Sequence, residues 1–325
     1  MNTFNSALIV AGTHGNELSG IYLHKLIKEK RYSVNRSTFS ACSIIANSEA
    51  AKHNVRYIDT DLNREFSAMN SNHCPDLHES KIAYQFIEKY ANQEKLLIVD
   101  LHNTTSNMGA TLILLSNDVF YRKLGAYVKQ RMPSAHVLFE ERKEWQEQPY
   151  LCTAGQYGIM IEVGAQAHGA LEYSTLELMK QMLTAVLDYV EKHNLNQIGL
   201  LSDYEAFFYT EEIRVPLDQE GMRQALVHPT ICGRDFEAVK PGAPLLATFA
   251  GYDIHWNGKG EIYPHFINES AYSTANIAMA LAKKDVFLPC NLKQVIRPRV
   301  TWIPHPMNKT VPEPHRQKIR VLTPP

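Results

Sequence analysis

Two side chains that can bind zinc, His14 and Glu17, lie close together near the start of the chain. A His-x-x-Glu spacing can bring an imidazole nitrogen and a carboxylate oxygen to one cation, as in an open catalytic zinc site. The pair is weak evidence by itself, because many turns between a strand and a helix carry these residues without a metal. A catalytic site would also need a third ligand and a base from elsewhere in the chain.

His102 is the residue that could complete such a metal site. It ends the apolar run LLIVDLH, which is typical of a buried strand, and a polar loop follows it. A histidine here can be a third zinc ligand, although a histidine satisfied within the loop is an equally simple interpretation. Asp100 would point to the same side of the strand as His102, where it could orient a ligand or cap a turn.

Glu162 is a candidate general base, because it lies inside the apolar stretch GIMIEVG. An ionised carboxylate is costly in such a strand unless it is paired, hydrogen-bonded or bound to a metal. Beside a zinc ion, it could take a proton from water and later deliver that proton to a leaving amine. The alternative is a structural glutamate paired with an arginine.

A dense group of charged and amide side chains follows in the segment RYIDTDLNRE, residues 56–65. Such runs are usually solvated surface, but two arginines and an asparagine without a lysine favour anion recognition. The planar guanidinium of arginine matches a carboxylate and can also stabilise an oxyanion. We therefore take Arg56, Asn63 and Arg64 as candidates for binding a substrate anion.

The elements that must position these residues alternate between strands and helices up to about residue 195. The first strand is the apolar run Ala7–Ala11, which stops at Gly12. Further strands are predicted at 38–46, 96–102, 111–115 and 158–163, and helices at 18–30, 77–90, 118–131 and 174–193. The alternation predicts an α/β fold with a parallel or mixed sheet. Ligands of such sheets bind at the carboxyl ends of the strands, where the candidate residues lie.

Two details of the helices follow from their sequences. In the helix at 18–30, the helical spacing predicts that Leu18, Ile21, Tyr22 and Leu26 face the core. The helix at 77–90 is predicted to be capped near Asp76, because aspartate is a favoured N-cap residue.

After Asn194 the sequence no longer alternates between strand and helix patterns. Strands are predicted at 203–217, 225–228, 244–250 and 261–267, separated by glycine, proline and aspartate turns. We therefore predict an α/β domain over 1–197 and a β-rich domain over 198–290. Residues 291–325 are predicted to form a proline-rich, basic tail.

Composition excludes several classes of protein. The chain has 325 residues and a formal net charge of −1, which argues against nucleic-acid binding through bulk electrostatics. The sequence has no basic leader with a long apolar core and no run of about 18 apolar residues, so we expect no membrane span. It has no glycine-rich phosphate loop, so we expect no nucleotide.

The cysteines favour a reduced, cytoplasmic protein. They are Cys42, Cys74, Cys152, Cys232 and Cys290, an odd number without a C-x-x-C pair. This pattern argues against a disulfide scaffold and a cysteine-based zinc site. Cys152 could be a nucleophile, but a packed and inert thiol is the favoured interpretation.

Five segments, taken in order, resemble the aspartoacylase family, a branch of the zinc-carboxypeptidase-like amidohydrolases that is related to succinylglutamate desuccinylase. They are GTHGNELSG, RYIDTDLNR, DLHNTTSNMGATLIL, GIMIEVG and NESAY, and the resemblance extends from about residue 7 to residue 275. A block such as DLHNTTSNMG is specific, whereas a His-x-x-Glu pair is common. The resemblance implies that residues 1–197 form a zinc-carboxypeptidase-like catalytic domain.

The resemblance also implies roles for particular residues. One zinc ion per chain would be held by His14, Glu17 and His102, with Glu162 as general base and acid. Arg56 would polarise the scissile carbonyl. The expected substrate contacts are Asn63, Arg64, Asn103, Tyr150 and Tyr272. Tyr150 matches a site tyrosine of the family, although its spacing to Glu162 differs.

The expected activity is zinc-dependent deacylation of a small N-acyl amino acid, with N-acetyl-L-aspartate, which yields acetate and L-aspartate, as the first candidate. The sequence departs from the family at one position. Animal aspartoacylases carry an arginine shortly after the site tyrosine, which grips the aspartate side chain, and YLCTAGQYGIMIE lacks it. Arg142 or Lys143 could substitute. Otherwise the substrate could be an N-succinyl or aromatic N-acyl amino acid.

Two other functions are disfavoured. A peptidase is less favoured because the second domain could cap the cleft against long chains, which is an argument from family analogy. A non-catalytic metal-binding protein is disfavoured because all the central candidate residues are present. The sequence leaves open whether the chain forms a homo-oligomer.

Overall fold

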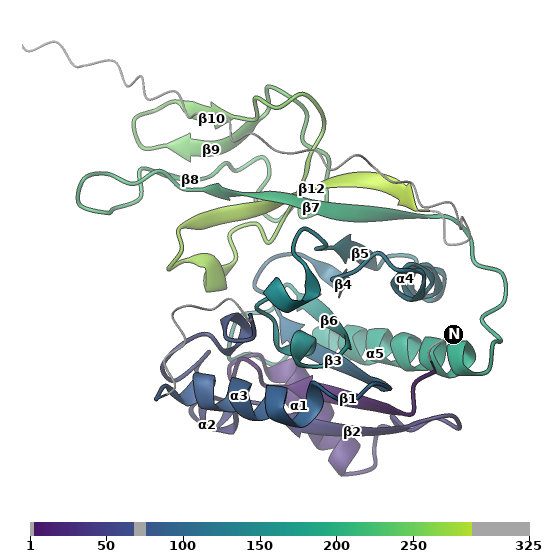
Figure 1. Cartoon of the computed structure of the whole chain (residues 1–325). Coiled ribbons are helices and arrows are strands. Elements are labelled where there is room, and N and C mark those ends of the chain that lie inside the picture. Colours follow the sequence, from purple (N-terminus) through teal and green to yellow (C-terminus); the bar gives the residue numbers. More distant parts are fainter. Residues whose placement is uncertain (1–2, 68–75, 288–325) are drawn as a thin grey trace, which may run out of the picture. The chain divides into compact units, whose positions relative to one another are not determined.

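The computed structural model describes residues 3–67 and 76–287 (Figure 1). The predicted tail lies outside these residues. Among the described helices, none is both long and apolar enough to cross a membrane.

A nine-stranded mixed sheet forms the centre of the molecule, in the order β11-β12-β7-β5-β4-β6-β3-β1-β2 (Figure 1). Its strands are β1 (Ser6–Ala11), β2 (Ser40–Ile45), β3 (Leu96–Asn103), β4 (Gly109–Leu114), β5 (His136–Phe139), β6 (Tyr157–Gly164), β7 (Tyr204–Arg214), β11 (Tyr263–His265) and β12 (Ile277–Phe287). The strands β2, β1, β3 and β6 run parallel, whereas β4 is antiparallel to β6. The predicted α/β fold with a mixed sheet is therefore confirmed.

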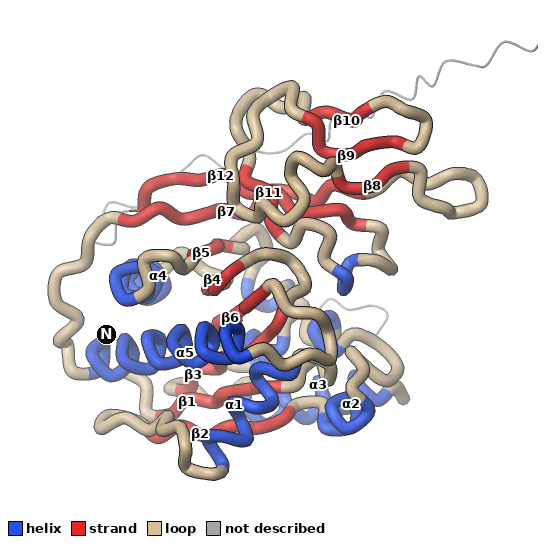
Figure 2. Tube along the Cα trace, turned by 180° about the vertical axis from the view of Figure 1, so that it is seen from behind, coloured by secondary structure: helices blue, strands red, loops and turns tan. Residues whose placement is uncertain are grey.

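Helices cover both faces of this sheet. They are α1 (Leu18–Lys28), α2 (Ser48–His53), α3 (His78–Tyr90), α4 (Val119–Arg131) and α5 (Tyr173–Asn194), with short 3-10 turns η1 (Leu62–Arg64), η2 (Trp145–Glu147), η3 (Leu151–Ala154) and η4 (Ser270–Tyr272). The helices α1, α4 and α5 share one core, and α5 runs along that face in Figure 2. Helix α3 and the turn η3 pack into the core on the opposite face.

Residues 7–11 of β1 are apolar on both faces of the sheet, so both faces are buried under helices. Ala7, Ile9 and Ala11 belong to the core under α1 and α5, whereas Leu8 and Val10 belong to the core under α3. A strand buried on both faces reads as a continuous apolar run, which is the pattern of a parallel sheet between helical layers.

The buried face of α1 differs from the prediction. Tyr22 is exposed, whereas Ser19, Gly20 and Leu23 are buried. A Cβ atom on Gly20 would lie 3.0 Å from the Cβ atom of Leu101, so the helix lies close to β3 along its small residues. Because α1 approaches β3 so closely, it buries the face that carries its small residues. Hydrophobic spacing alone predicts a different buried face.

The predicted cap of the helix at 77–90 is wrong. Helix α3 begins at His78 with Leu77 as its N-cap residue, and no side chain of the N-cap residue bonds to the helix. The amide of His78 instead donates to Asp59 Oδ2 at 2.8 Å. A carboxylate from a distant loop therefore takes the place of the local cap at Asp76.

The C-terminal part is β-rich, as predicted. The strands β8 (Ala225–Val227), β9 (Pro244–Thr248) and β10 (Asp253–His255) form a separate antiparallel sheet, at the top of Figure 1. They pack around a third apolar core, which they share with β12 of the main sheet. However, β7 pairs with β5, so the main sheet continues across the predicted boundary at 197/198. The exact domain boundaries stay a prediction.

The sheet brings the candidate residues together. The strands β1, β3 and β6 are neighbours, and their carboxyl ends lie at one edge. His102 on β3 is directly opposite Glu162 on β6. The turn that carries His14 and Glu17 follows the end of β1.

His265 on β11 is fully buried among aromatic rings, and its Nε2 has no hydrogen-bond partner among the described residues. Its ring stacks on Phe236, whose ring also contacts His136. Tyr209 of β7 and His136 are the titratable groups beside it. Burial lowers the pKa of His265 from 6.5 to about 4, so the folded protein favours the neutral imidazole.

We predict that acid destabilises the fold through His265. Below pH 6.5 the unfolded chain binds this proton, whereas the folded chain does not until near pH 4, so stability falls as the pH falls through this window. The residue should account for about 1.5 kcal/mol of the stability lost between pH 6.5 and pH 5. Urea unfolding at both pH values should show a smaller loss for His265→Phe than for the wild type. Equal losses would contradict the prediction.

Candidate active site

The turn after β1 presents the first two candidate ligands. Gly12 has a φ of +62°, which lets the strand end abruptly. A Cβ atom on Gly15 would lie 2.0 Å from the carbonyl carbon of Ala50 in α2, so only glycine allows this approach. The turn is therefore packed against α2, with the side chains of His14 and Glu17 in a buried pocket.

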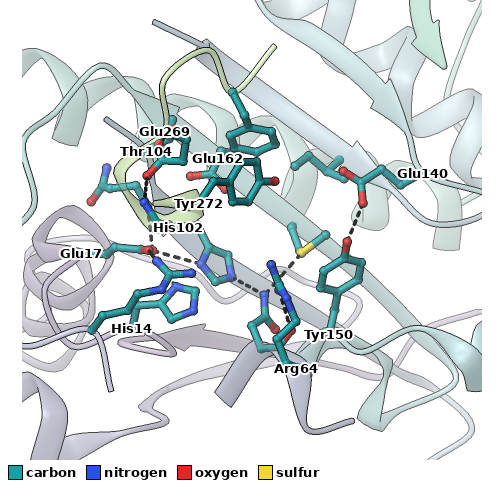
Figure 3. Close-up of a pocket in the computed structure, with 17 residues that line it drawn as sticks. His14, Glu17, Arg64, His102, Thr104, Glu140, Tyr150, Glu162, Glu269 and Tyr272 are labelled. Carbon is teal, nitrogen blue, oxygen red and sulfur yellow. Dashed lines mark hydrogen bonds and ion pairs between the residues drawn. The ribbon is translucent and has the colours of Figure 1, made fainter. Parts of the chain in front are cut away.

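His14, Glu17 and His102 form one compact cluster (Figure 3). Glu17 Oε1 lies 2.7 Å from Nδ1 of His14, and Glu17 Oε2 lies 3.0 Å from Nδ1 of His102. One ligand atom from each residue lies within 4.8 Å of the others. Two imidazole nitrogens and a carboxylate oxygen at this spacing fit a divalent metal such as zinc.

Two further carboxylates hold the other nitrogen of each histidine. Asp61 Oδ1 lies 2.8 Å from His14 Nε2. Asp100 Oδ2 lies 2.9 Å from His102 Nε2, an ion-pair distance without the alignment of a hydrogen bond. The other oxygen of Asp100 accepts from Thr13 at 2.6 Å. Carboxylates in these positions orient the ligand histidines of metal sites, which is the role suggested for Asp100 by the sequence.

The residues of the cluster shift the pKa values of Glu17 and His102. Burial raises the pKa of Glu17, but His14 and His102 outweigh it and hold that pKa well below its usual range. Burial lowers the pKa of His102, but Asp100 and Glu17 raise it well above its usual value. The surroundings therefore favour a negative charge on Glu17 and a positive charge on His102.

Glu162 differs from the other buried carboxylates of the pocket in having an orphaned oxygen. Its Oε1 is buried without a hydrogen-bond partner, and no arginine of the described chain forms an ion pair with it. Burial raises its pKa well above the usual range, and Glu17 and Glu269 raise it further against the effect of His102. The alternative of an arginine-paired structural glutamate is therefore not what the structure shows.

The segment from Arg56 to Arg64 supplies further polar groups to the pocket that holds the metal-ligand cluster. Arg56 donates from Nε and Nη2 to Asp61 Oδ2 at 3.2 and 3.0 Å, and from Nη1 to Glu17 at 3.2 Å. Asn63 accepts from the amide of Leu151 at 2.7 Å. Arg64 lies over the ring of Tyr150, 5.8 Å from its centroid. The candidate anion-binding residues therefore face the same pocket as the cluster.

Glu79 of α3 holds this segment in place. Its carboxylate accepts from the amides of Ile58, Asp59 and Thr60 at 2.7, 3.0 and 3.1 Å, and from Asn47 Nδ2 at 2.8 Å. The side chain is fully buried, so these four donors satisfy a charge that water does not reach. Nothing in the sequence indicated this role, because the helix and the loop meet only in the fold.

All ten candidate residues line one pocket. They are His14, Glu17, Arg56, Asn63, Arg64, His102, Asn103, Tyr150, Glu162 and Tyr272. Sequence reasoning missed seven further lining residues, which are Thr104, Ile113, Glu140, Met160, Phe266, Glu269 and Ala271. The structure thus places the ten residues around one pocket, whereas their chemical roles stay predictions.

Glu269 connects the β-rich part to the end of β3. Its Oε2 accepts from the hydroxyl of Thr104, from the amide and hydroxyl of Thr105 at 2.8 and 3.0 Å, and from the amide of Ser106 at 3.3 Å. The loop after His102 is thereby fixed by a residue more than 160 positions away. Glu269 lies within the NESAY motif, which was the available indication.

The two cations suggested as substitutes for the missing arginine do not line the pocket. Arg142 lies over the ring of Tyr209, 5.8 Å from its centroid, and Lys143 is exposed. Cys152 is fully buried, and burial raises the pKa of its thiol well above the usual range. The favoured interpretation of Cys152 as a packed, inert thiol therefore holds.

Two family models match the chain. The succinylglutamate desuccinylase/aspartoacylase catalytic domain matches residues 3–190. The AstE/AspA barrel-sandwich hybrid domain matches residues 202–284. Together these agree with a catalytic domain followed by a smaller β-rich domain.

Individual relatives cover nearly the whole chain. A probable aspartoacylase from a Nostoc species is 34% identical over 89% of this chain and 99% of its own length. A human N-acyl-aromatic-L-amino acid amidohydrolase (carboxylate-forming) is 32% identical over 86% of this chain and 90% of its own length. The crystal structure of murine aminoacylase 3 has a TM-score of 0.80 at 29% identity, covering 88% of this chain and 98% of that chain.

We predict that Glu79→Ala loosens the segment 58–60. Three backbone amides lose their acceptor, so the free energy of unfolding should fall by about 3 kcal/mol. Hydrogen exchange of these amides should become faster. Glu88→Ala, an exposed position on the same helix, is the matched control. Exchange rates that stay equal in the two variants would disprove the role of Glu79.

Proposed function

Because the chain belongs to the succinylglutamate desuccinylase/aspartoacylase family, we propose that it is a zinc-dependent amidohydrolase acting on an N-acyl amino acid. The products would be a carboxylic acid and a free amino acid. The observation that carries this proposal is the His14, Glu17 and His102 cluster beside the orphaned carboxylate of Glu162. A metal site next to an unpaired carboxylate is an arrangement that can hydrolyse an amide.

The proposed metal ligands are His14, Glu17 and His102. This mixture of two imidazole nitrogens and one carboxylate oxygen would favour zinc over magnesium or calcium. When bound, zinc would act as a Lewis acid that makes water a better nucleophile and polarises the amide carbonyl. Asp61 and Asp100 would keep the two histidines in the tautomer that binds a metal.

Glu162 is the proposed general base and acid. It would take a proton from the attacking water as the carbon–oxygen bond forms, and deliver it to the nitrogen as the carbon–nitrogen bond breaks. The proton is returned in each turnover, so Glu162 ends as it began. Its burial beside His102 supports this role, because a carboxylate with a raised pKa can both accept and return a proton near neutral pH.

The arginines are proposed to bind the two negatively charged parts of the reacting molecule. Arg56, oriented by Asp61, would stabilise the oxyanion that develops on the amide carbonyl. Arg64 and Asn63 would hold the α-carboxylate and so fix the carbonyl over the catalytic groups. Asn103, Tyr150 and Tyr272 are proposed as further substrate contacts.

Two substrate classes compete. N-acetyl-L-aspartate is the candidate from the family resemblance, and several relatives are named probable aspartoacylases. An aromatic N-acyl amino acid is favoured by the pocket itself, because Ile113, Met160, Phe266 and Tyr272 line it and the only lining cations of the described chain are Arg56, Arg64 and the ligand histidines. Relatives from Xenopus and human carry the corresponding name. We therefore propose the aromatic class first.

The proposed partner is a small molecule, and we propose a cytoplasmic protein in agreement with its cysteine pattern. We expect neither a nucleic acid nor a membrane as a partner. Light scattering in solution would test whether the chain forms a homo-oligomer.

A direct assay tests the proposed function. The zinc-loaded protein is incubated with N-acetyl-tyrosine, N-acetyl-phenylalanine, N-acetyl-aspartate and N-succinyl-glutamate, and free amine is measured with and without a chelator. We expect chelator-sensitive release, fastest from the aromatic substrates. Release from N-acetyl-aspartate alone would return the assignment to aspartoacylase. No release from any substrate, with zinc bound, would overturn the proposal.

Metal analysis tests the ligands separately from turnover. We predict about one zinc ion per wild-type chain and a loss of at least tenfold in zinc affinity for His102→Ala, because one of three protein ligands is removed. His53→Ala, an exposed histidine paired with Glu49, should keep full zinc affinity. Equal zinc binding by the two variants would exclude His102 as a ligand.

Glu162→Gln tests the base. The amide keeps the size of the side chain but cannot accept the proton, so kcat should fall by about 10²- to 10⁴-fold while zinc content is unchanged. Atomic absorption and amine release on the same sample separate the two effects. Near-normal turnover in this variant would assign the base to another residue.

A further inference from the structure

The pocket has a second polar end, away from the metal cluster. In Figure 3, Glu140 and Tyr150 lie together on the opposite side of the pocket from His14 and Glu17. Glu140 follows β5 directly, and Tyr150 precedes the turn η3. Neither element contributes to the metal cluster, so this end is built independently of it.

Glu140 has one satisfied and one available oxygen. Its Oε2 accepts a hydrogen bond from the hydroxyl of Tyr150 at 2.9 Å, and this pairing fixes the carboxylate in the pocket wall. Within the described residues, Oε1 has no hydrogen bond and the side chain forms no ion pair. A half-buried carboxylate with a free oxygen at a pocket wall is available to a ligand.

Among the described residues, no cation forms an ion pair with Glu140. Arg64 and Lys143 act on it from a distance, and Arg142 lies over the ring of Tyr209. Burial raises the pKa of Glu140, whereas its hydrogen bond with Tyr150 and the charge of Arg64 lower it. A substrate carboxylate that enters this end of the pocket would be repelled by the negative charge of Glu140 in a partly desolvated site. Otherwise one of the two carboxylates would have to take up a proton.

The remaining walls between the two ends are apolar or aromatic. Ile113, Met160 and Phe266 line the pocket with Tyr272, and they offer no anion-binding group. When the scissile carbonyl lies over the metal cluster, the amino-acid side chain begins three bonds away from its carbon. That side chain is therefore the part of the substrate that can extend toward the second end.

We propose that Glu140 is a specificity-determining residue, which rejects a substrate side chain with a carboxylate and favours an aromatic side chain with a hydrogen-bond donor at its tip. The inference rests on the proposed deacylation at the same site. It predicts that a phenol, whose hydroxyl can donate to Oε1, is preferred to an unsubstituted phenyl ring. A hydrogen bond to a charged acceptor is worth about 1.5 kcal/mol, which corresponds to roughly tenfold in kcat/KM.

Two variants separate the charge of Glu140 from its hydrogen bond. Glu140→Gln removes the charge but keeps one neutral oxygen acceptor, so kcat/KM for N-acetyl-aspartate should rise about tenfold while the preference for N-acetyl-tyrosine over N-acetyl-phenylalanine is only partly lost. Glu140→Leu removes both, so the ratio of kcat/KM for these two aromatic substrates should fall toward one. Glu141→Gln, an exposed neighbour that does not line the pocket, is the matched control and should behave as the wild type.

Binding measurements distinguish this inference from the proposed reaction. Calorimetry with the same three ligands in the Glu162→Gln background measures recognition without turnover. Stronger N-acetyl-aspartate binding after Glu140→Gln supports the inference even if no amine is released by the parent protein. If neither binding nor kcat/KM for N-acetyl-aspartate differs between the Glu140→Gln and Glu141→Gln variants, the inference is wrong. A wild-type preference for N-acetyl-aspartate would overturn it as well.

Discussion

The carboxylate of Glu17 is the contact on which the geometry of the site depends. Its Oε1 meets His14 and Arg56, and its Oε2 meets His102 and the backbone amide of Asn103. These groups come from the turn after β1, the loop before η1 and the end of β3. A buried carboxylate must find partners as the chain folds, because an uncompensated charge in this position would cost several kcal/mol. Assembly of the site is therefore coupled to assembly of the sheet edge.

Four other buried or half-buried glutamates surround this centre, and their contacts distinguish their roles. Glu79 and Glu269 are saturated with backbone and hydroxyl donors, so they hold the loops that follow α2 and β3. Glu162 and Glu140 each keep one oxygen that has no partner in the described part of the chain, so they remain available to a bound molecule. Burial alone does not separate the two groups. What separates them is whether the fold supplies enough donors to each carboxylate.

Local sequence patterns are sufficient to predict some of the strands and not others. Strands that are buried on both faces, such as β1 and β3, are visible as continuous apolar runs. The strand β12 was missed because its segment IAMALAKKDVF is rich in alanine and lysine, which favour a helix. Its pairing with β7 along ten residue pairs overrides this preference. The four-residue β5 is too short to show a period, although it leads directly to Glu140.

The sequence by itself determined the alternation of strands and helices, the family resemblance and ten of the 17 residues that line the pocket. These depend on residue type and short-range spacing, which remain visible in a linear chain. Only the tertiary structure decided the partners of each side chain. It placed Glu79 against the segment 58–60, Glu269 against the loop after β3, and Glu140 against Tyr150. The physical reason is that the partners of a buried charge come from distant segments, and only folding sets the distances between them.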